Sequence, residues 1–263
     1  MAVAIAMGIA LRNAGLVAVV AWWVTVGGMV VDLVVPSTVG LTAMRMVAPV
    51  TIVAAVLAVA LGAPTVPSIV ALALALLATA LVLSGEIGEA MVQGSAYGHE
   101  QRFPLRPPAA LLLPMATSWV LWCATVLGSI LLLRDHRWAL GVVVTAVAGA
   151  LTWLLAGRFN RLSNRWLVLV PAGVVVRDAL VLGETLMVQR HNLAAVQLAL
   201  DDTRAADLTG PAAGNAVEVA VREVVLAVFP SSAEHPTGRA IHVQSFLVSP
   251  TRPGRVLQRV NDR

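Results

Sequence analysis

The side chains that could do chemistry are few, and they lie far apart along the chain. The sequence has five histidines in separate segments and a single cysteine, Cys123, so neither type shows the spacing of zinc ligands. Ser95, in GSAYG, lacks the glycine two positions earlier that a Gly-x-Ser-x-Gly nucleophile turn requires. The acids Asp201, Asp202 and Asp207 are typical of surface turns. We therefore predict no catalytic residue, no cofactor and no metal site.

One acid, Asp32, lies inside an apolar stretch between Val30 and Val35. Acids within membrane segments are often functional, which makes a proton or ion role in a small transporter one hypothesis for Asp32. Asp32 also lies close enough to Pro36 to reach the membrane interface. A secondary transporter would normally show repeats and several broken, polar helices, which this sequence does not.

Arginines gather in two polar segments, residues 85–108 and 158–165. The guanidinium fork matches phosphate oxygens, and an anionic leaflet attracts basic groups beside a span. We therefore predict that these arginines contact lipid headgroups or a partner protein; the alternative is a solvated loop with local ion pairs. The candidates are Arg102, Arg106, Arg158, Arg161 and Arg165.

Long apolar runs separate these polar segments. Hydrophobic residues make up 59% of the 263 residues and charged residues 12%, against about 45–50% and 25% in soluble domains. A helix of about 20 apolar residues crosses a bilayer, so we predict a bundle of about five transmembrane helices. Their approximate bounds are 14–35, 47–63, 68–84, 109–133 and 138–156. Because Pro64 and Pro67 separate two short runs, residues 47–84 either cross twice or form a re-entrant pair.

The arginines also predict an orientation. The basic side chains are all arginine, and the net charge of +4 lies in the apolar half of the chain, between apolar runs, which does not indicate nucleic-acid binding. With five spans, one side carries Arg45, Arg102, Arg106, Arg158, Arg161 and Arg165, and the other carries Arg12, Arg134 and Arg137. This bias predicts a multi-pass protein of the plasma (inner) membrane whose C-terminal domain is cytoplasmic. Trp138 and Trp166, near span boundaries, are interpreted as interface anchors.

After the basic collar at 158–165, the pattern changes to an alternation of period two over residues 166–263, which indicates half-buried antiparallel strands. Val256, Leu257 and Val260 then lie on one face of a final helix. We expect a small, mostly-β domain, a curved sheet or barrel closed by a C-terminal helix. The predicted strands are 166–170, 174–177, 180–182, 185–190, 216–222, 224–229 and 241–248.

A pair of membrane helices, an arginine-rich collar and then RWLVLVPAGVVVRDALVLGETLMVQRHNLAAVQL resemble bacterial pleckstrin-homology-like (bPH) membrane proteins. The chain also resembles a group of uncharacterised actinobacterial integral membrane proteins, in which stretches similar to GSAYGHEQRFPLRPP and NRWLVLVPAGVVVRD recur together. The resemblance covers about residues 94–263. It implies a PH-like roll at the membrane face and no established catalytic activity, and it supplies no catalytic residues.

Three hypotheses of function follow. The first is a non-enzymatic scaffold or accessory subunit of a cell-envelope membrane complex, with other membrane proteins as partners. The second is an anionic-lipid-binding or lipid-transport accessory protein, whose partners are membrane lipids or an envelope lipid-transport complex. The third is a small transporter that uses Asp32.

Overall fold

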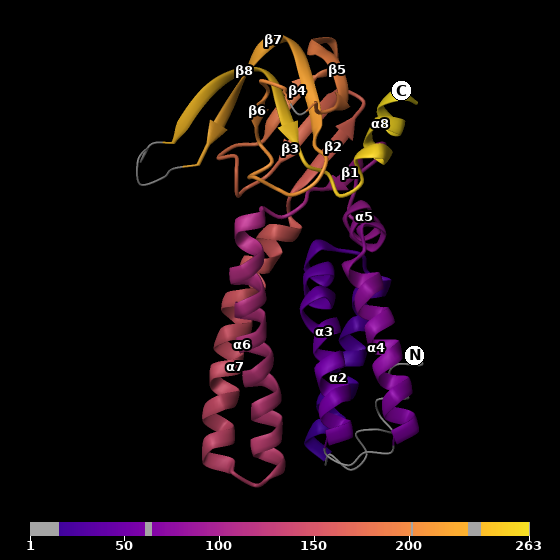
Figure 1. Ribbon diagram of the computed structural model, residues 1–263, viewed down its shortest axis with the longest axis vertical. Coiled ribbons are helices and arrows are strands. Elements are labelled where there is room, and N and C mark those ends of the chain that lie inside the picture. The colour runs from indigo at the N-terminus through magenta and orange to yellow at the C-terminus, as the bar shows by residue number, and fades with distance from the viewer. Residues whose placement is uncertain (1–15, 61–64, 201, 231–237, 263) are drawn as a thin grey trace. The chain divides into compact units, whose positions relative to one another are not determined.

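The computed structural model describes residues 16–60, 65–200, 202–230 and 238–262. The chain divides into two compact units, shown in Figure 1. The helical unit comprises Met1–Gly88 and Met115–Phe159, and the β unit comprises Glu89–Pro114 and Asn160–Arg263. Arg12, the first residues of the first predicted span, Pro64 and Asp201 lie outside the described residues.

Four helices among the described residues are long and apolar enough to cross a membrane, which agrees with the prediction of a membrane protein. They are α3 (Thr38–Ala60), α4 (Thr65–Leu83), α6 (Ala109–Arg134) and α7 (Trp138–Ser163). The first predicted span corresponds to α2 (Leu16–Val34). Within it, Trp23–Val34 forms an apolar helix that is shorter than the 18 residues expected of a span. The fifth crossing therefore stays a prediction.

Two spans are longer than their uncharged runs. Helix α3 begins at Thr38 rather than at residue 47, and α7 continues to Ser163 rather than ending at 156. Helix α3 can include the charged Arg45 because the side chain of Arg45 is hydrogen-bonded. The Nε of Arg45 donates to the carbonyl of Val82 near the end of α4, at 3.4 Å. Because α7 continues to Ser163, most of the basic collar predicted at 158–165 forms the last two turns of this helix.

Tryptophan side chains join the helices of the helical unit. Pro49, inside α3, has no N–H with which to bond the carbonyl of Arg45. One turn away, the indole Nε1 of Trp119 in α6 donates to the carbonyl of Met46, at 2.8 Å. Trp122 likewise donates to the Oγ1 of Thr152 in α7, at 2.8 Å. These bonds surround a buried apolar cluster that includes Met46, Trp122, Cys123 and Leu155.

The segment at 85–108 contains a helix and a strand, α5 (Gly85–Gln93) and β1 (Gln101–Pro104). The Oγ of Ser84 accepts the N–H of Ile87 at the start of α5. At its end, the side-chain amide of Gln93 donates to the carbonyl of Glu100 at 2.8 Å and accepts the N–H of Arg102 at 2.9 Å. A segment that the sequence suggested as a loop thus supplies a strand to the β unit.

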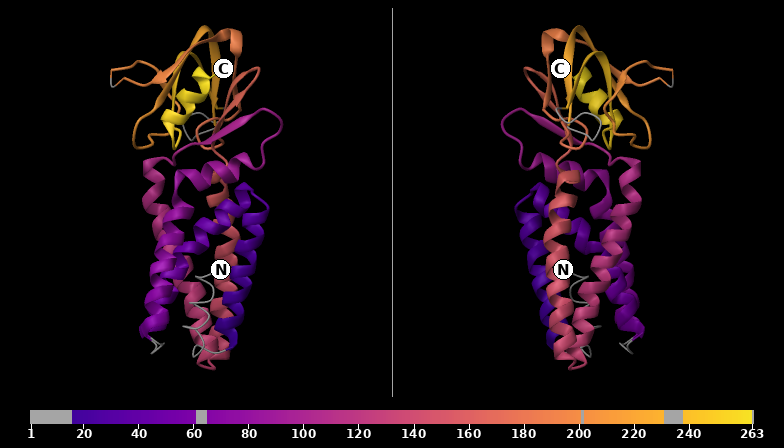
Figure 2. Two further views of the ribbon diagram at one scale, coloured as in Figure 1. Left: turned by 90° about the vertical axis from the view of Figure 1, so that its right-hand side faces the viewer. Right: turned by 90° about the vertical axis from the view of Figure 1, so that its left-hand side faces the viewer.

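The β unit contains two four-stranded sheets and a C-terminal helix. The first has the order β1-β2-β3-β4 and is antiparallel throughout, and the second has the order β5-β7-β8-β6. The remaining strands are β2 (Trp166–Val170), β3 (Gly173–Arg177), β4 (Leu186–Gln189), β5 (Leu193–Leu198), β6 (Ala206–Asp207), β7 (Val217–Phe229) and β8 (Arg239–Val248). Figure 2 shows from two sides how α8 (Pro253–Asn261) lies against the strands.

Alternate residues of both sheets face one apolar core. The tight turn between β2 and β3 requires Gly173, whose φ is 153° and on which a Cβ would clash with the carbonyl oxygen of Val188. The register of β7 with β8 shifts between Ala220 and Val225. The C-terminal half of β7 lies beside the chain that leads into β4, and there the backbone N–H of Gly183 donates to the carbonyl of Val228 at 2.8 Å. One bent strand therefore connects both sheets.

The general layout of apolar helices followed by a mostly-β region with a final helix is confirmed. The strand predicted at 180–182 is wrong, because these residues form a turn that places Leu182 in the core. The strands predicted at 216–222 and 224–229 form the single strand β7. The prediction lacked β1, β5 and β6.

Candidate functional site

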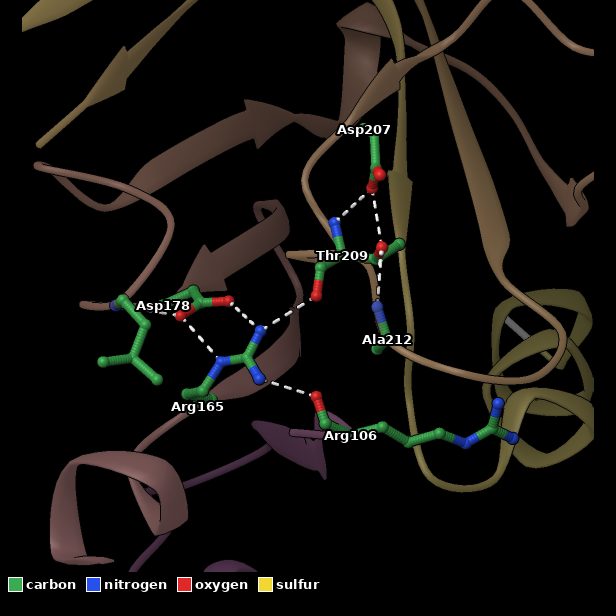
Figure 3. A network of polar contacts seen from close by, with 7 residues as sticks. Arg106, Arg165, Asp178, Asp207, Thr209 and Ala212 are labelled. Carbon is green, nitrogen blue, oxygen red and sulfur yellow. Dashed lines mark hydrogen bonds and ion pairs between the residues drawn. The ribbon is translucent and has the colours of Figure 1, made fainter. Parts of the chain in front are cut away.

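Arg165 and Asp178 form an ion pair at the centre of a polar network in the β unit (Figure 3). The Nε of Arg165 donates to Oδ1 of Asp178 at 2.8 Å, and Nη2 donates to Oδ2 at 2.6 Å. Both side chains are wholly buried. Arg165 precedes β2 and Asp178 follows β3, and the pairing of Trp166 with Arg177 places the two side by side. The hairpin itself thus creates the ion pair.

The remaining hydrogen bonds of the pair connect two further segments and the turn that follows β3. Nη1 of Arg165 donates to the carbonyl of Arg106 at 2.6 Å, and Nη2 also donates to the carbonyl of Thr209 at 3.2 Å. Oδ1 of Asp178 accepts the N–H of Leu180 at 3.1 Å. Buried charges are stable only when they are paired and hydrogen-bonded, and this pair meets that condition. Its role is to join segments of the β unit.

The guanidinium of Arg106 lies on the turn at 213–215. Its Nη1 donates to the carbonyls of Ala213 and Asn215 at 3.0 and 3.3 Å, and a Cβ at Gly214 would clash with it. The same loop has an internal turn, in which Oδ1 of Asp207 accepts both the N–H and the hydroxyl of Thr209 (Figure 3). Arg106 therefore holds this loop through its guanidinium, while its carbonyl accepts from Arg165, which also donates to the carbonyl of Thr209 in the loop.

Trp166 lies between two arginines on neighbouring strands. The guanidinium carbons of Arg102 in β1 and Arg177 in β3 are each 5.3 Å from the centre of a Trp166 ring, which is cation–π geometry. Trp166 is 5% exposed, so its interpretation as an interface anchor was wrong. Arg102 also pairs with Glu100 at 2.6 Å and donates to the Oγ of Ser95 at 3.0 Å. Arg177 is exposed.

The local hydrogen bonds lower the pKa of Glu100. The backbone N–H of Tyr97 donates to Oε1 of Glu100 at 2.6 Å, and this bond is the largest cause. Burial opposes it, and the hydrogen bond and positive charge of Arg102 add to the lowering. Glu100 is therefore ionised at neutral pH and holds the turn before β1.

The five candidate arginines have different surroundings. Arg158 and Arg161 are exposed in the last turns of α7, as expected of groups that meet lipid or a partner. Arg102 and Arg106 are half-buried and bonded within the β unit. Arg165 is wholly buried, so we withdraw it as a headgroup contact: its charge is neutralised by Asp178 inside the domain.

Asp32 lies in the helical unit, near the end of α2. A Cβ placed on Gly40 would be 2.9 Å from Oδ1 of Asp32, so the carboxylate lies against the first turn of α3. The N-terminus of a helix favours a negative charge, which accounts for an acid at this position. The transporter hypothesis gains no support from these surroundings.

Sequence reasoning missed Asp178, Thr209 and Arg177 as members of these contacts. The sequence could have indicated Asp178, because the predicted hairpin turns at Pro171 and Ala172. A hairpin with this turn pairs Trp166 with Arg177 and therefore brings Arg165 opposite Asp178. The bonds to Arg106 and Thr209 join residues far apart in sequence, and no local pattern indicated them.

The β unit also has a cavity of about 240 Å³, which is apolar apart from one arginine. Its lining residues are Leu169, Val170, Gly173, Val174, Arg190, Leu193 and Val260. Among the described residues, no group of three or more His, Cys, Asp or Glu side chains is placed to hold a metal ion.

Comparison with known proteins gave no relative. No model of a protein family matches the chain, and neither a curated protein nor a solved structure matches it.

Proposed function

We propose that this protein is a non-catalytic integral membrane protein that presents its β unit as a docking module, as a scaffold or accessory subunit of a cell-envelope complex. The observation that supports the proposal is the pairing of β1, which precedes the helices α6 and α7 in the chain, with β2, which follows them. The backbone N–H of Leu105 donates to the carbonyl of Arg165 at 2.9 Å and extends this pairing.

Short connections attach the paired strands to two membrane-capable helices. β1 ends at Pro104 and α6 begins at Ala109, while α7 ends at Ser163 and β2 begins at Trp166. The β unit is therefore continuous in sequence with two membrane-capable helices through two adjacent strands of one sheet, which supports a folded module carried by a membrane protein.

The finer features of the proposal come from the sequence. We propose that the β unit is a PH-like roll on the cytoplasmic side of the plasma membrane, as in the bPH proteins that the sequence resembles. Two small sheets with a C-terminal helix are compatible with such a roll. The arginine bias supports the cytoplasmic side, and the all-arginine, Ala- and Val-rich composition fits an actinobacterial source.

Purification of the tagged full-length protein from native membranes in mild detergent tests the proposal. We expect defined partner proteins to co-purify. Asp178→Asn, which breaks the ion pair of the β unit, should release them, whereas Trp122→Phe, a change in the helical unit, should not. Recovery of the chain as a lone monomer would contradict a scaffold role.

A second candidate function is the binding of anionic lipid, favoured by the exposed Arg158 and Arg161 at the end of α7. Native mass spectrometry of the protein from mixed-lipid nanodiscs should show retained anionic lipid. Replacing both arginines with Gln should reduce this retention, while Arg222→Gln, an exposed position on β7, serves as the control. Equal retention in all three proteins would remove the idea.

A further inference from the structure

Helix α8 covers the edge of the second sheet at β5. The strand order places β5 at this edge, and α8 packs beside it. The sequence of β5, LAAVQL, contains neither a charged residue nor a proline, which are two common protections of a sheet edge. A covering helix is a third protection, and α8 supplies it.

Helix α8 is too short to persist without its tertiary contacts. It has nine residues, Pro253–Asn261, and Gly254 in its first turn lowers its helix propensity. At its N-terminus, the side chain of Arg252 makes no capping hydrogen bond. Isolated helices shorter than about 12 residues are marginal in water. The helix is therefore stable only while it lies on the β unit.

Three apolar side chains attach α8 to the core, and they are packed unevenly. Val256 is wholly buried, whereas Leu257 and Val260 are only partly buried against the core. Val260 lines the cavity of about 240 Å³ together with Leu193, the first residue of β5. Atoms that line a void lose packing contacts on one side. Helix α8 is therefore packed more tightly at Val256 than near its C-terminal end.

Polar contacts hold the start of α8. Glu89 pairs with Arg255 at 2.9 Å and with Arg252 at 3.5 Å, and the two arginine side chains are 43% and 35% exposed. Ion pairs with this exposure are weak and are screened by salt. Just before the helix, the backbone N–H of Thr251 donates to the carbonyl of Pro104 at 2.8 Å. This bond fixes the chain up to Thr251, so a movement of α8 would pivot at Arg252.

We propose that α8 is a lid of the β unit, which opens about Arg252 while both sheets stay folded. In the closed state, α8 covers β5 and supplies one wall of the cavity (Figure 2). In the open state, the uncharged edge of β5 and the apolar residues under α8 are exposed. Salt favours the open state because it weakens the pairs with Glu89. The lid thus controls the exposure of this edge, and the inference does not depend on the docking function.

Thiol labelling of the full-length protein in detergent tests the lid, in a Cys123→Ala background that removes the native cysteine. Val256→Cys places a thiol under α8, and Val219→Cys places one on β7 in the same core; both valines are wholly buried. We expect a soluble maleimide to label the first thiol about tenfold faster or more, because a lid opens without global unfolding. Raising the salt from about 0.1 to about 1 M should speed only the first reaction. Equal rates for the two thiols would overturn the inference.

Substitutions at Val260 test the loosely packed end of the lid. Val260→Leu extends into the cavity and should slow the labelling of the Val256→Cys thiol several-fold, whereas Val260→Ala should speed it. Val224→Ala, at an exposed position on β7, is the control and should leave the rate unchanged. Equal rates in all these variants would contradict a lid whose opening depends on the cavity.

Hydrogen exchange of the unmodified protein gives the same comparison without a cysteine. Amides of α8 should exchange faster than those of β2, and more so at high salt. Exchange of α8 at the same rate as β2 would show that the helix opens only with the whole unit, which would overturn the lid. Thermal unfolding of each variant shows that it is folded.

Discussion

Arg165 and Asp178 are joined by two hydrogen bonds, of 2.8 and 2.6 Å, and neither side chain reaches solvent. Arg165 makes two further bonds, to the carbonyls of Arg106 and Thr209. The ion pair therefore joins the first sheet to the chain before α6 and to the loop after β6. The pair therefore connects segments of the β unit that are far apart in the sequence.

Asp178→Asn should destabilise the β unit strongly. Removal of one charge of a buried pair leaves the other uncompensated and costs about 3–5 kcal/mol. Arg165→Lys should also destabilise, since a single ammonium cannot replace the planar fork. Thermal unfolding of the purified protein measures both effects. Glu184→Gln, an exposed change, is the control, and equal stability of Asp178→Asn and this control would contradict the structural role.

Glu89→Gln should loosen the C-terminal helix. Glu89 accepts from Arg255 at 2.9 Å and from Arg252 at 3.5 Å, so it connects α5 to the start of α8. Because these groups are partly exposed, the loss in global stability should stay below about 1 kcal/mol. Hydrogen exchange should nevertheless become faster at 253–261 than in β2, and unchanged exchange there would show that apolar packing alone holds α8.

The turn at 97–102 should depend on pH through Glu100. Its pKa is lower in the folded protein than the ordinary value of 4.5, so its contribution to stability is complete above that value and is lost as the pH falls through the folded pKa. In NMR, the carboxyl of Glu100 should titrate below 4.5. Arg102→Gln should raise the midpoint only partly, because the Tyr97 bond remains. A midpoint at the ordinary value in the unmodified protein would contradict this geometry.

Trp119→Phe should weaken the packing of α6 on α3. The change keeps the aromatic ring but removes the hydrogen bond to Met46. Hydrogen bonds between membrane helices average about 0.6 kcal/mol, so a small loss of stability in detergent is expected. Trp122→Phe, which removes the bond to Thr152, should have a similar effect. A gain in stability in either variant would show that the indole N–H is not well accommodated.

The sequence predicted the elements whose hydrophobic pattern is regular, namely the long apolar helices and the alternating strands. The apolar runs identified four membrane-capable helices, and alternation identified the β2–β3 hairpin, because each signal is local. The ends of α3 and α7 were missed because they contain arginines, which seemed to mark loops. Arg45 is accommodated by a carbonyl of α4, a contact that no local pattern shows.

The candidate site was less predictable than the fold. Exposed and buried arginines look alike in sequence, so Arg158 and Arg165 were grouped although their environments differ completely. β1 was missed because it is a short strand whose partner β2 follows both helices of the intervening hairpin. Such pairing depends on tertiary contacts, which residue periodicity does not encode.

The pairing of β1 with β2 also constrains how the protein is made. A ribosome synthesises residues 101–104 well before 166–170, and the two helices α6 and α7 emerge in between. The first sheet therefore cannot be completed until translation has passed both helices. A recombinant fragment that starts at Trp166 would lack β1 and Arg106, leaving β2 as a bare edge and Arg165 absent. Soluble expression of the tail alone should consequently yield an incomplete, aggregation-prone domain.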